Sequence, residues 1–434
     1  MGAHQEAAAE VNPHYLNHLL ACGARQELMA RQDILVEGGA CLLSQGSRIG
    51  PAARERLLLN RLTQPLEACV QFQHPVTGPQ LAEQAQQLLE TDELLAPLCP
   101  AGRGRPLPES LGRLELSPSV QALLTLLADQ RRLPHALRVA LLTLSQARRL
   151  LPGQVERHQQ LALAALLHDV GELYLDPELL GQADTLAALQ WRPIASHPLI
   201  AHRLLQRMEG AGPAVAAAVL DHHERLDGFG FPRGIAQGAF PLDHQVLAAA
   251  EWLAGLLEAG GSALLRASIA ARLIPGEFHP ALLGWVHQAA QAPQARNWEP
   301  APLALGQVRV ERLARALQQA RTLLPWASQQ QQRASATLSQ LLDLHLARLR
   351  RLLAGFSSAG LDSLTPDALL HSVAEAQDAE LQRDLQALVD EFCWRLQELE
   401  REALLHSSRL GAAEAAVLHR LLAQLNEPAQ RAAA

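Results

Sequence analysis

The sequence contains no lysine, so all 37 of its basic side chains are arginines. This absence removes every lysine that a phosphate-binding site would use. Positive charge is also in short supply, because 44 acidic residues outnumber the arginines and the formal net charge is −7. A balance of this sign gives no electrostatic reason to expect a nucleic acid polymer as a partner.

Long apolar runs and paired cysteines are missing as well. No apolar run reaches the roughly 18 to 20 residues that a membrane-spanning helix needs. The first ten residues lack the basic-then-apolar layout of a signal peptide. The cysteines are few and have no Cys-x-x-Cys spacing: Cys22, Cys41, Cys69, Cys99 and Cys393. They are typical of reduced core thiols, so the sequence predicts a cytoplasmic protein without a membrane span.

Composition and length indicate a globular chain of several domains. Apolar residues make up 48% and charged residues 19%, which is an ordinary globular balance. A chain of 434 residues leaves room for two to four domains. We predict three parts, covering residues 1–108, 109–298 and 299–434.

The first part has the pattern of a small α/β module with a sensory or adaptor role. Short apolar runs from residue 33 to about 73 are separated by glycines, which predicts a hairpin turning at Gly38-Gly39. A helix is expected over residues 51–62, with Pro51 in its first turn. The Gly/Pro/Arg stretch of residues 100–108 is the expected linker.

The remaining two parts are predicted to be helical. Residues 117–292 have apolar spacing typical of helices, starting at Ser117-Pro118 and including an apolar helix that ends at His168. In the third part, leucines recur at steps of three and four over residues 338–353 and 381–399. These stripes predict long amphipathic helices that pair as a hairpin, a bundle or a dimerising coiled coil.

The most informative feature is a series of histidines and carboxylates between residues 166 and 232. His168-Asp169 and His222-His223 are adjacent pairs, with His197 between them. Imidazole nitrogens and a carboxylate oxygen can converge on two neighbouring cations such as Fe, Mn or Zn, and two metals can orient a hydroxide for attack on phosphorus. Since adjacent side chains leave the backbone on different sides, His222 and His223 can serve one site only at a helix end or turn.

The segment of residues 135–285 resembles the HD-GYP branch of the HD phosphohydrolase superfamily, whose members hydrolyse the bacterial second messenger cyclic di-GMP. The resemblance lies in six motifs in family order: HALRV from His135, LLHDVGE from Leu166, SHP from Ser196, HHERLDGFGFPRG from His222, AAE from Ala249 and GEFHP from Gly276. It covers about a third of the chain. It implies a mainly α protein, with an all-helical HD-domain core between the α/β module and the C-terminal bundle or coiled coil.

Carried over residue by residue, the resemblance implies two divalent metal ions, with Fe or Mn favoured and Zn, Mg or Ni as further candidates. One ion would be held by His135, His168, Asp169 and Glu251, and the second by Asp169, His197, His222 and His223. Asp169 is also the predicted catalytic residue, because a bridging carboxylate offsets the repulsion of two cations that activate a shared water. Arg225 and Arg233 are either substrate-binding phosphate contacts or plain surface charges.

Several positions depart from the family pattern. Glu172 replaces the lysine that would contact a substrate phosphate, and Phe231 replaces the motif tyrosine. Glu251 replaces an aspartate, which keeps the oxygen donor but adds a methylene. Arg131 stands where three-metal members carry a glutamate. The second aspartate after Glu251 and the Arg-Pro-Tyr loop that contacts the nucleotide are absent.

Two functions are compatible with retained metal ligands and altered substrate-binding positions. The first is a metal-dependent phosphodiesterase that hydrolyses cyclic di-GMP or a related phosphodiester by a metal-bound hydroxide. The second is a catalytically weak or inactive scaffold that keeps the metal-built fold and binds a signalling protein partner, with a homodimer through the C-terminal helices as a further expectation. The retained ligands favour the enzyme, because buried unpaired histidines and a carboxylate are costly. The altered substrate positions favour the scaffold.

Overall fold

The computed structural model describes residues 10–102, 104–181, 191–235, 237–260, 262–291, 303–363, 365–376 and 378–426. They form two compact units. The first holds the described residues of 10–181, 193–224 and 238–254, and the second holds those of 191–192, 225–237 and 255–426. Within the described residues, none of the helices combines the length and apolar character that a bilayer crossing requires. The fold is mainly α, as the sequence predicts, with two small sheets.

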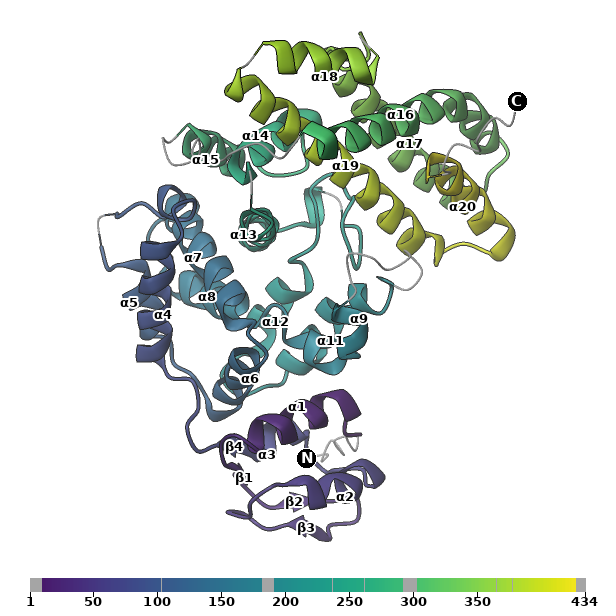
Figure 1. Cartoon of the computed structure of the whole chain (residues 1–434). Coiled ribbons are helices and arrows are strands. Elements are labelled where there is room, and N and C mark those ends of the chain that lie inside the picture. The colour runs from purple at the N-terminus through teal and green to yellow at the C-terminus, as the bar shows by residue number, and fades with distance from the viewer. Residues whose placement is uncertain are drawn as a thin grey trace. The chain divides into compact units, whose positions relative to one another are not determined.

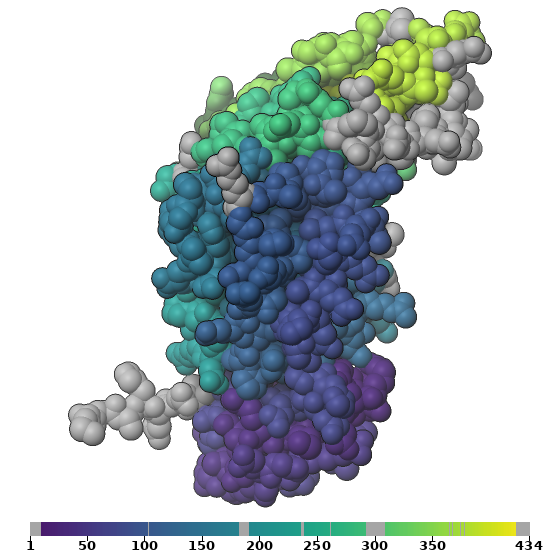
Figure 2. Space-filling model, turned by 90° about the vertical axis from the view of Figure 1, so that its left-hand side faces the viewer, coloured from purple at the N-terminus to yellow at the C-terminus, as the bar shows by residue number. Residues whose placement is uncertain are grey.

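The N-terminal module contains both sheets. Strand β1 (Leu28–Ala30) pairs antiparallel with β4 (Val70–Phe72), and β2 (Ile34–Leu35) pairs antiparallel with β3 (Cys41–Leu43). The predicted hairpin is confirmed, because its turn uses Gly38 and Gly39 at φ 100° and 86°, a region that favours glycine. Figure 2 shows this module in purple, in contact with the blue helices that follow it in the same unit.

The helix predicted over residues 51–62 is shorter than expected. A 3₁₀ turn (Pro51–Ala53) leads into α2 (Arg54–Leu59), and Asn60 is extended. The next residues are needed for pairing with the hairpin: Glu37 donates its N–H to Arg61, and Thr63 donates its N–H to Leu35. Strand pairing therefore ends the helix at Leu59.

Most of the first unit is helical (Figure 1). Its helices are α1 (Pro13–Gly23), α2, α3 (Leu66–Cys69), α4 (Gly78–Thr91), α5 (Leu107–Gly112), α6 (Pro118–Asp129), α7 (Leu133–Leu150), α8 (Val155–Leu167), α9 (Pro177–Gly181), α11 (His197–Leu205), α12 (Gly212–Leu220) and most of α13 (Leu242–Glu258). Helix α6 begins at Pro118, which confirms the predicted helix start, and the Ser117 side chain caps it by accepting the Val120 N–H. The core is the near-continuous apolar packing of α6, α7 and α8, where Leu124, Leu141 and Leu166 are fully buried.

The second unit is a bundle of long helices. Its helices are α14 (Ala263–Leu273), α15 (Pro280–Ala290), α16 (Leu303–Gln331), α17 (Ala336–Ser358), α18 (Pro366–Glu375), α19 (Ala379–Ser407) and α20 (Ala412–Asn426). The two leucine stripes lie on α17 and α19, and members of both, including Leu342 and Leu399, contribute to one core. Phe229, from the loop after the His-His pair, belongs to the same core.

The compact units do not follow the three-part division at residues 108 and 298. The N-terminal module packs with the histidine-bearing helices, while the segment of residues 225–235 belongs with the C-terminal helices. The three-part division stays a prediction. The boundary at residue 298, the segment before residue 10 and Arg103 of the expected linker lie outside the described residues.

Candidate metal centre

A sharp turn after α8 presents His168 and Asp169 together. The apolar helix ends at Leu167, His168 caps it, and Asp169 precedes a 3₁₀ turn, η3 (Val170–Tyr174). His168 is fully buried and the Asp169 side chain is 16% exposed. The helix thus delivers the pair to its own end, as the sequence predicts.

The other predicted ligands come from four different elements. His135 lies in the first turn of α7, His197 begins α11, and Glu251 lies in α13. His222 and His223 follow the last residue of α12, and their ring centroids are 4.2 Å apart. Both histidines face one site because the helix has just ended. Within a helix, two adjacent side chains would point to different sides.

Three of the histidines are oriented by the same backbone contact. The Nδ1 atoms of His168, His197 and His222 lie 2.7, 2.7 and 2.5 Å from the carbonyl oxygens of Ala165, Ile194 and Val219, each three residues earlier. A carbonyl can only accept, so Nδ1 of each ring carries a proton, and Nε2 is the nitrogen that is left to offer a lone pair to a cation once it is unprotonated. This is the usual way in which a protein fixes a metal-binding histidine.

The seven predicted ligands converge in two adjoining groups. Donor atoms of each group lie within 4.8 Å of one another: His135, His168 and Glu251 in one, and Asp169, His197, His222 and His223 in the other. Asp169 lies between them. Its Oδ2 is 3.1 Å from Nε2 of His168, and its Oδ1 is 3.3 Å from Nε2 of His197. One carboxylate oxygen therefore faces each group, which is the arrangement that a bridging ligand needs.

The electrostatics of the centre suit cations. Burial favours neutral carboxyls, but the neighbouring histidines hold the pKa of Asp169 and of Glu251 well below their ordinary values. Burial lowers the pKa of His168, yet the carboxylates of Asp169 and Glu251 outweigh it and raise that pKa to about 10. Burial, with His197 and His168 nearby, lowers the pKa of His222 to about 3. The two carboxylates are therefore charged and His222 is neutral, and a cation bound by His168 would displace a proton.

The donor set fits two divalent cations. Five imidazoles and two carboxylates form a mixed N/O shell of the kind that Fe, Mn or Zn accept. Nε2 of His135 is 3.1 Å from Oε2 of Glu251 and 3.3 Å from Nε2 of His168. The extra methylene of Glu251 therefore does not keep its carboxylate from the first group.

Three further contacts support the centre, and among the supporting residues only Gly171 was singled out by a motif. Gly171 lies so close to α11 that a Cβ there would overlap the backbone oxygen of His197. His244 contacts the buried Asp221 at 2.8 Å, which ties the end of α12 to the start of α13. His202 of α11 contacts the carbonyl oxygen of Ala216 in α12 through Nδ1. The signal for Gly171 was present in the sequence, since it is the glycine of the His-Asp motif.

The anomalous Glu172 has a partner. It forms an ion pair with Arg132, whose side chain is 34% exposed while that of Glu172 is 12% exposed. Arg132 is three residues before His135, and Glu172 is three residues after Asp169. The glutamate is therefore compensated, and the pair joins the two segments that carry ligands of the first group. Sequence reasoning missed Arg132.

The predicted substrate-binding arginines lie in the second unit. Arg225 is 6% exposed, lies 3.8 Å from the carboxylate of Glu277 and stacks over the ring of Phe278. Arg233 is exposed, and its backbone oxygen accepts from Arg409. The assignment of these two arginines to substrate stays a prediction.

The N-terminal module reaches the turn that carries Asp169. Tyr15 and Tyr174, the two tyrosines of the chain, stack with ring centroids 4.8 Å apart. The Tyr174 hydroxyl donates to the buried carboxylate of Glu67, and Asn12 donates to the Tyr174 carbonyl at 3.2 Å. Since Tyr174 ends η3, the module packs five residues from Asp169.

Comparisons with known proteins identify this region. Residues 121–273 match the family model of the HD domain. A cyclic di-GMP phosphodiesterase of Pseudomonas aeruginosa is 33% identical over 132 residues, covering 28% of this chain and 31% of the relative. A 3'3'-cGAMP-specific phosphodiesterase of Vibrio cholerae is 33% identical over 105 residues, covering 24% of each chain. The chain spans about a third or less of the length of these relatives.

A solved HDG"Y"P protein of Bdellovibrio bacteriovorus aligns at 18% identity with a TM-score of 0.34, covering 49% of this chain and 69% of that one, a likeness too weak to bear on the fold. The sequence relatives also include a cyclic di-GMP phosphodiesterase response regulator of Xanthomonas campestris, 34% identical over 98 residues, which cover 22% of this chain and 26% of the relative. Residues 121–273 of this chain therefore match the HD domain, and the region is similar in sequence to cyclic di-GMP and 3'3'-cGAMP phosphodiesterases.

Proposed function

We propose that this chain is a metal-dependent phosphodiesterase that hydrolyses cyclic di-GMP or a related cyclic dinucleotide. The observation that carries the proposal is the convergence of all seven predicted ligands, with one oxygen of Asp169 directed toward each group. Two divalent cations held there would supply Lewis acidity and an activated water to a phosphodiester.

The residues of the chain prepare the centre for that task. Asp169 and Glu251 bring negative charge that offsets the repulsion between two cations. His168, His197 and His222 are held by backbone carbonyls, so their Nε2 atoms point inward without reorganisation. The buried apolar packing of α7 and α8 limits water around the site, which strengthens each electrostatic contact.

Arg132 is the proposed substitute for the missing lysine. It is the arginine closest in sequence to His135 on the N-terminal side, and its pairing with Glu172 fixes it beside the His-Asp turn. About a third of its side chain is exposed, which leaves it accessible to a phosphate oxygen. A guanidinium can hold phosphate through two parallel hydrogen bonds.

The alternative is a scaffold that binds metal and signals through a protein partner. One specific observation favours it, since Glu172 places a carboxylate where the family has a phosphate-contacting cation, and Arg132 is already engaged by that carboxylate. In this case the metal centre stabilises the fold, and the N-terminal module or the C-terminal helices bind the partner.

The deciding experiment measures metal content and turnover on the same preparation. The purified chain is expected to contain about two metal ions per chain by elemental analysis. Chromatography should detect hydrolysis of cyclic di-GMP or 3'3'-cGAMP, the substrates named for the sequence relatives. Asp169→Ala removes the bridging carboxylate and should abolish both metal binding and turnover.

The outcomes separate the two candidates. If the chain holds two metals but hydrolyses neither dinucleotide faster than Asp169→Ala does, the enzyme proposal is overturned and the scaffold is favoured. Absence of bound metal after loading with Mn²⁺ or Fe²⁺ would overturn the ligand assignment itself.

A further inference from the structure

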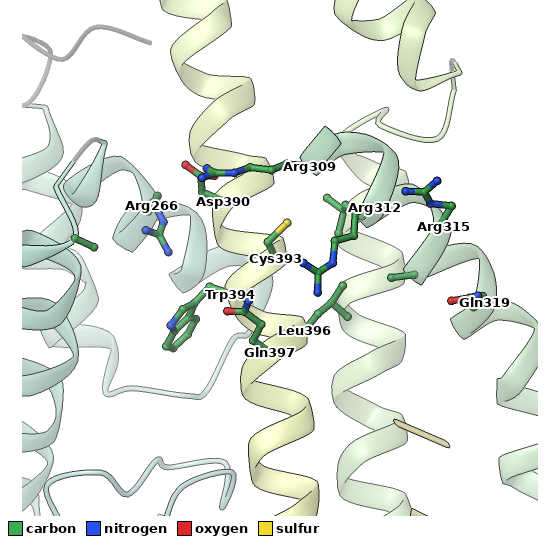
Figure 3. Close-up of a pocket in the computed structure, with 13 residues that line it drawn as sticks. Arg266, Arg309, Arg312, Arg315, Gln319, Asp390, Cys393, Trp394, Leu396 and Gln397 are labelled. Atoms are coloured by element: carbon green, nitrogen blue, oxygen red, sulfur yellow. The ribbon is translucent and has the colours of Figure 1, made fainter. Parts of the chain in front are cut away.

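A second candidate site lies in the second unit, apart from the metal centre. It is a cavity of about 670 Å³. Its walls come from α14, α16 and α19, and its polar lining consists of Arg266, Arg309, Arg312, Arg315, Gln319, Asp390 and Gln397. Figure 3 shows the arginines of α16 on one side of the cavity and Trp394 and Gln397 of α19 on the other.

The lining carries an excess of positive charge. Four arginines line the cavity, but only one carboxylate does, that of Asp390. Asp390 pairs with Arg309 at 2.6 Å. Among the described residues, neither Arg312 nor Arg315 forms an ion pair or a side-chain hydrogen bond. At least two guanidinium groups therefore remain available to an anion within this cavity.

Arg266 adds a buried donor that lacks an acceptor. Its side chain is 11% exposed, and one nitrogen lies 3.5 Å from the fully buried Glu391. Its Nε atom is buried and has no hydrogen-bond partner in the part of the chain that the structure describes. A buried N–H of this kind costs free energy unless an oxygen satisfies it. The arginine is thus held in place with unused donor capacity.

The arginines of α16 are more than a solvated helix face. Arg309, Arg312 and Arg315 recur every three residues, which lines them up on one side of the helix. On a plain solvated face nothing would stand opposite them. Here Cys393, Trp394 and Gln397 of α19 line the same cavity. Burial and Asp390 raise the pKa of the Cys393 thiol, the nearby Arg309, Arg312 and Arg266 oppose that shift, and the net pKa is about 11.

The cavity also offers an aromatic and apolar wall. Trp394 lines it, together with Leu313 and Leu396. The guanidinium of Arg395 lies 4.6 Å from the Trp394 ring centroid. A planar ring stacked on an indole, with charged oxygens reaching nearby guanidinium groups, is the combination that phosphorylated nucleosides offer.

We propose that this arginine cavity binds a nucleoside phosphate. Its phosphate oxygens accept hydrogen bonds from Arg312, Arg315 and Arg266, and its base lies against Trp394. Arginine guanidinium groups supply all the fixed positive charge that holds the ligand, since the chain has no lysine. This site is separate from the proposed hydrolytic centre and does not depend on its activity.

The test uses the full-length Asp169→Ala protein in EDTA, so that phosphate cannot be held through bound metal. ADP is titrated while tryptophan fluorescence and heat are followed, with pyrophosphate and adenosine as probes of its two halves. ADP is expected to bind more tightly than pyrophosphate, and adenosine more weakly than either. Trp394→Phe should retain binding but lose the fluorescence change.

Matched double variants locate the site. Arg312→Gln/Arg315→Gln should weaken ADP binding by about tenfold or more, because each removes a charge-assisted hydrogen bond. Arg333→Gln/Arg351→Gln removes the same charge from exposed positions of the same unit that do not line the cavity, and should change affinity by less than about twofold. Melting curves of both variants confirm folding.

Three results would overturn the proposal. They are no binding of ADP at millimolar concentration, an equal loss of affinity in both double variants, and a fluorescence change that survives in Trp394→Phe. The second would assign the binding to diffuse charge, and the third would assign the signal to another tryptophan.

Discussion

At the residue scale, the metal centre depends on positions that carry no ligand atom. Backbone carbonyls of Ala165, Ile194 and Val219 set the tautomers of three histidines. Gly171 lets the turn after Asp169 lie against the backbone of His197. These contacts determine where the nitrogen lone pairs point, so substitutions there should change metal binding without removing a ligand.

We therefore expect Gly171→Ala to reduce metal content. The added methyl group cannot fit beside the backbone oxygen of His197, so either the turn or α11 must move, and a shift of about 1 Å is enough to spoil a coordination site. Elemental analysis after loading with Mn²⁺ measures the effect. Gly255→Ala is the matched control, because a Cβ there meets open space. Full metal content in Gly171→Ala would contradict this account.

The Arg132–Glu172 pair gives a second prediction at this scale. Arg132→Gln leaves the largely buried Glu172 carboxylate without its cation and should cost about 1–3 kcal/mol of unfolding free energy. The double variant Arg132→Gln/Glu172→Gln should regain most of that loss, since both charges are gone. Urea unfolding of the two single variants and the double variant measures the coupling. Additive losses would mean that the two side chains do not interact.

At the element scale, a buried ionic network joins the loop after the His-His pair to α17 and α19. Arg348, 2% exposed, contacts Asp227 at 2.8 Å, Glu277 at 3.0 Å and Glu398 at 2.6 Å. Arg395, fully buried, contacts Glu277 and Glu398 as well. Burying so many charges is tolerable only because each is paired. Phe229 of the same loop also contacts this network, because the guanidinium of Arg348 lies 4.0 Å from its ring centroid.

The histidine beside this network predicts a pH dependence. His345 is 1% exposed, its Nδ1 donates to the Leu341 carbonyl, and its ring meets Phe229 and His406. Burial lowers its pKa, the Leu341 contact opposes that shift, Arg348 adds to it, and the net pKa is about 4. The unfolded chain therefore binds a proton at this position between pH 4 and about 6.5, where the folded chain does not.

Stability should consequently be fully present above pH 6.5 and fall as the pH drops toward 4. This histidine contributes about 1.4 kcal/mol per pH unit in that window. His345→Gln cannot titrate and should lose that part of the slope, while His406, whose pKa burial lowers to about 3, retains its own part. Urea unfolding at pH 5 and pH 7 tests this. Identical slopes for the two proteins would show that His345 is already charged in the folded state.

At the scale of the whole molecule, all seven metal ligands lie in the first compact unit and the arginine cavity lies in the second. A ligand that binds only the folded form stabilises the unit that holds it. Each unit should therefore respond to its own ligand, metal in one case and nucleoside phosphate in the other.

Metal removal should lower the melting temperature of the first unit. Loading at 100 times the dissociation constant stabilises a site by about 2.7 kcal/mol, and each kcal/mol is worth about 2–4 °C in a unit of this size. Calorimetry of the Mn²⁺-loaded chain before and after EDTA measures the shift. Asp169→Ala should melt at one temperature in both conditions, and an equal shift in that variant would assign the effect to metal bound elsewhere.

Much of the fold and the ligand set could be predicted from the sequence. Apolar periodicity predicted the helices, glycines predicted the hairpin turn, and motif order predicted the ligands that the structure brings together, because these signals are local in the chain. The helix over residues 51–62 was predicted too long, since its last residues pair with Val36 and its neighbours, a contact that helical propensity does not encode.

The sequence by itself determined which side chains are available: five histidines and two carboxylates at family spacing, and arginine as the sole fixed cation. Only the tertiary structure decided their partners. It paired Arg132 with Glu172, oriented the two oxygens of Asp169 toward separate groups, buried Arg225 and gathered four arginines from two helices around one cavity. The physical reason is that pairs such as Arg132–Glu172 and Arg225–Glu277 join residues 40 or more positions apart, whose proximity depends on packing rather than on local pattern.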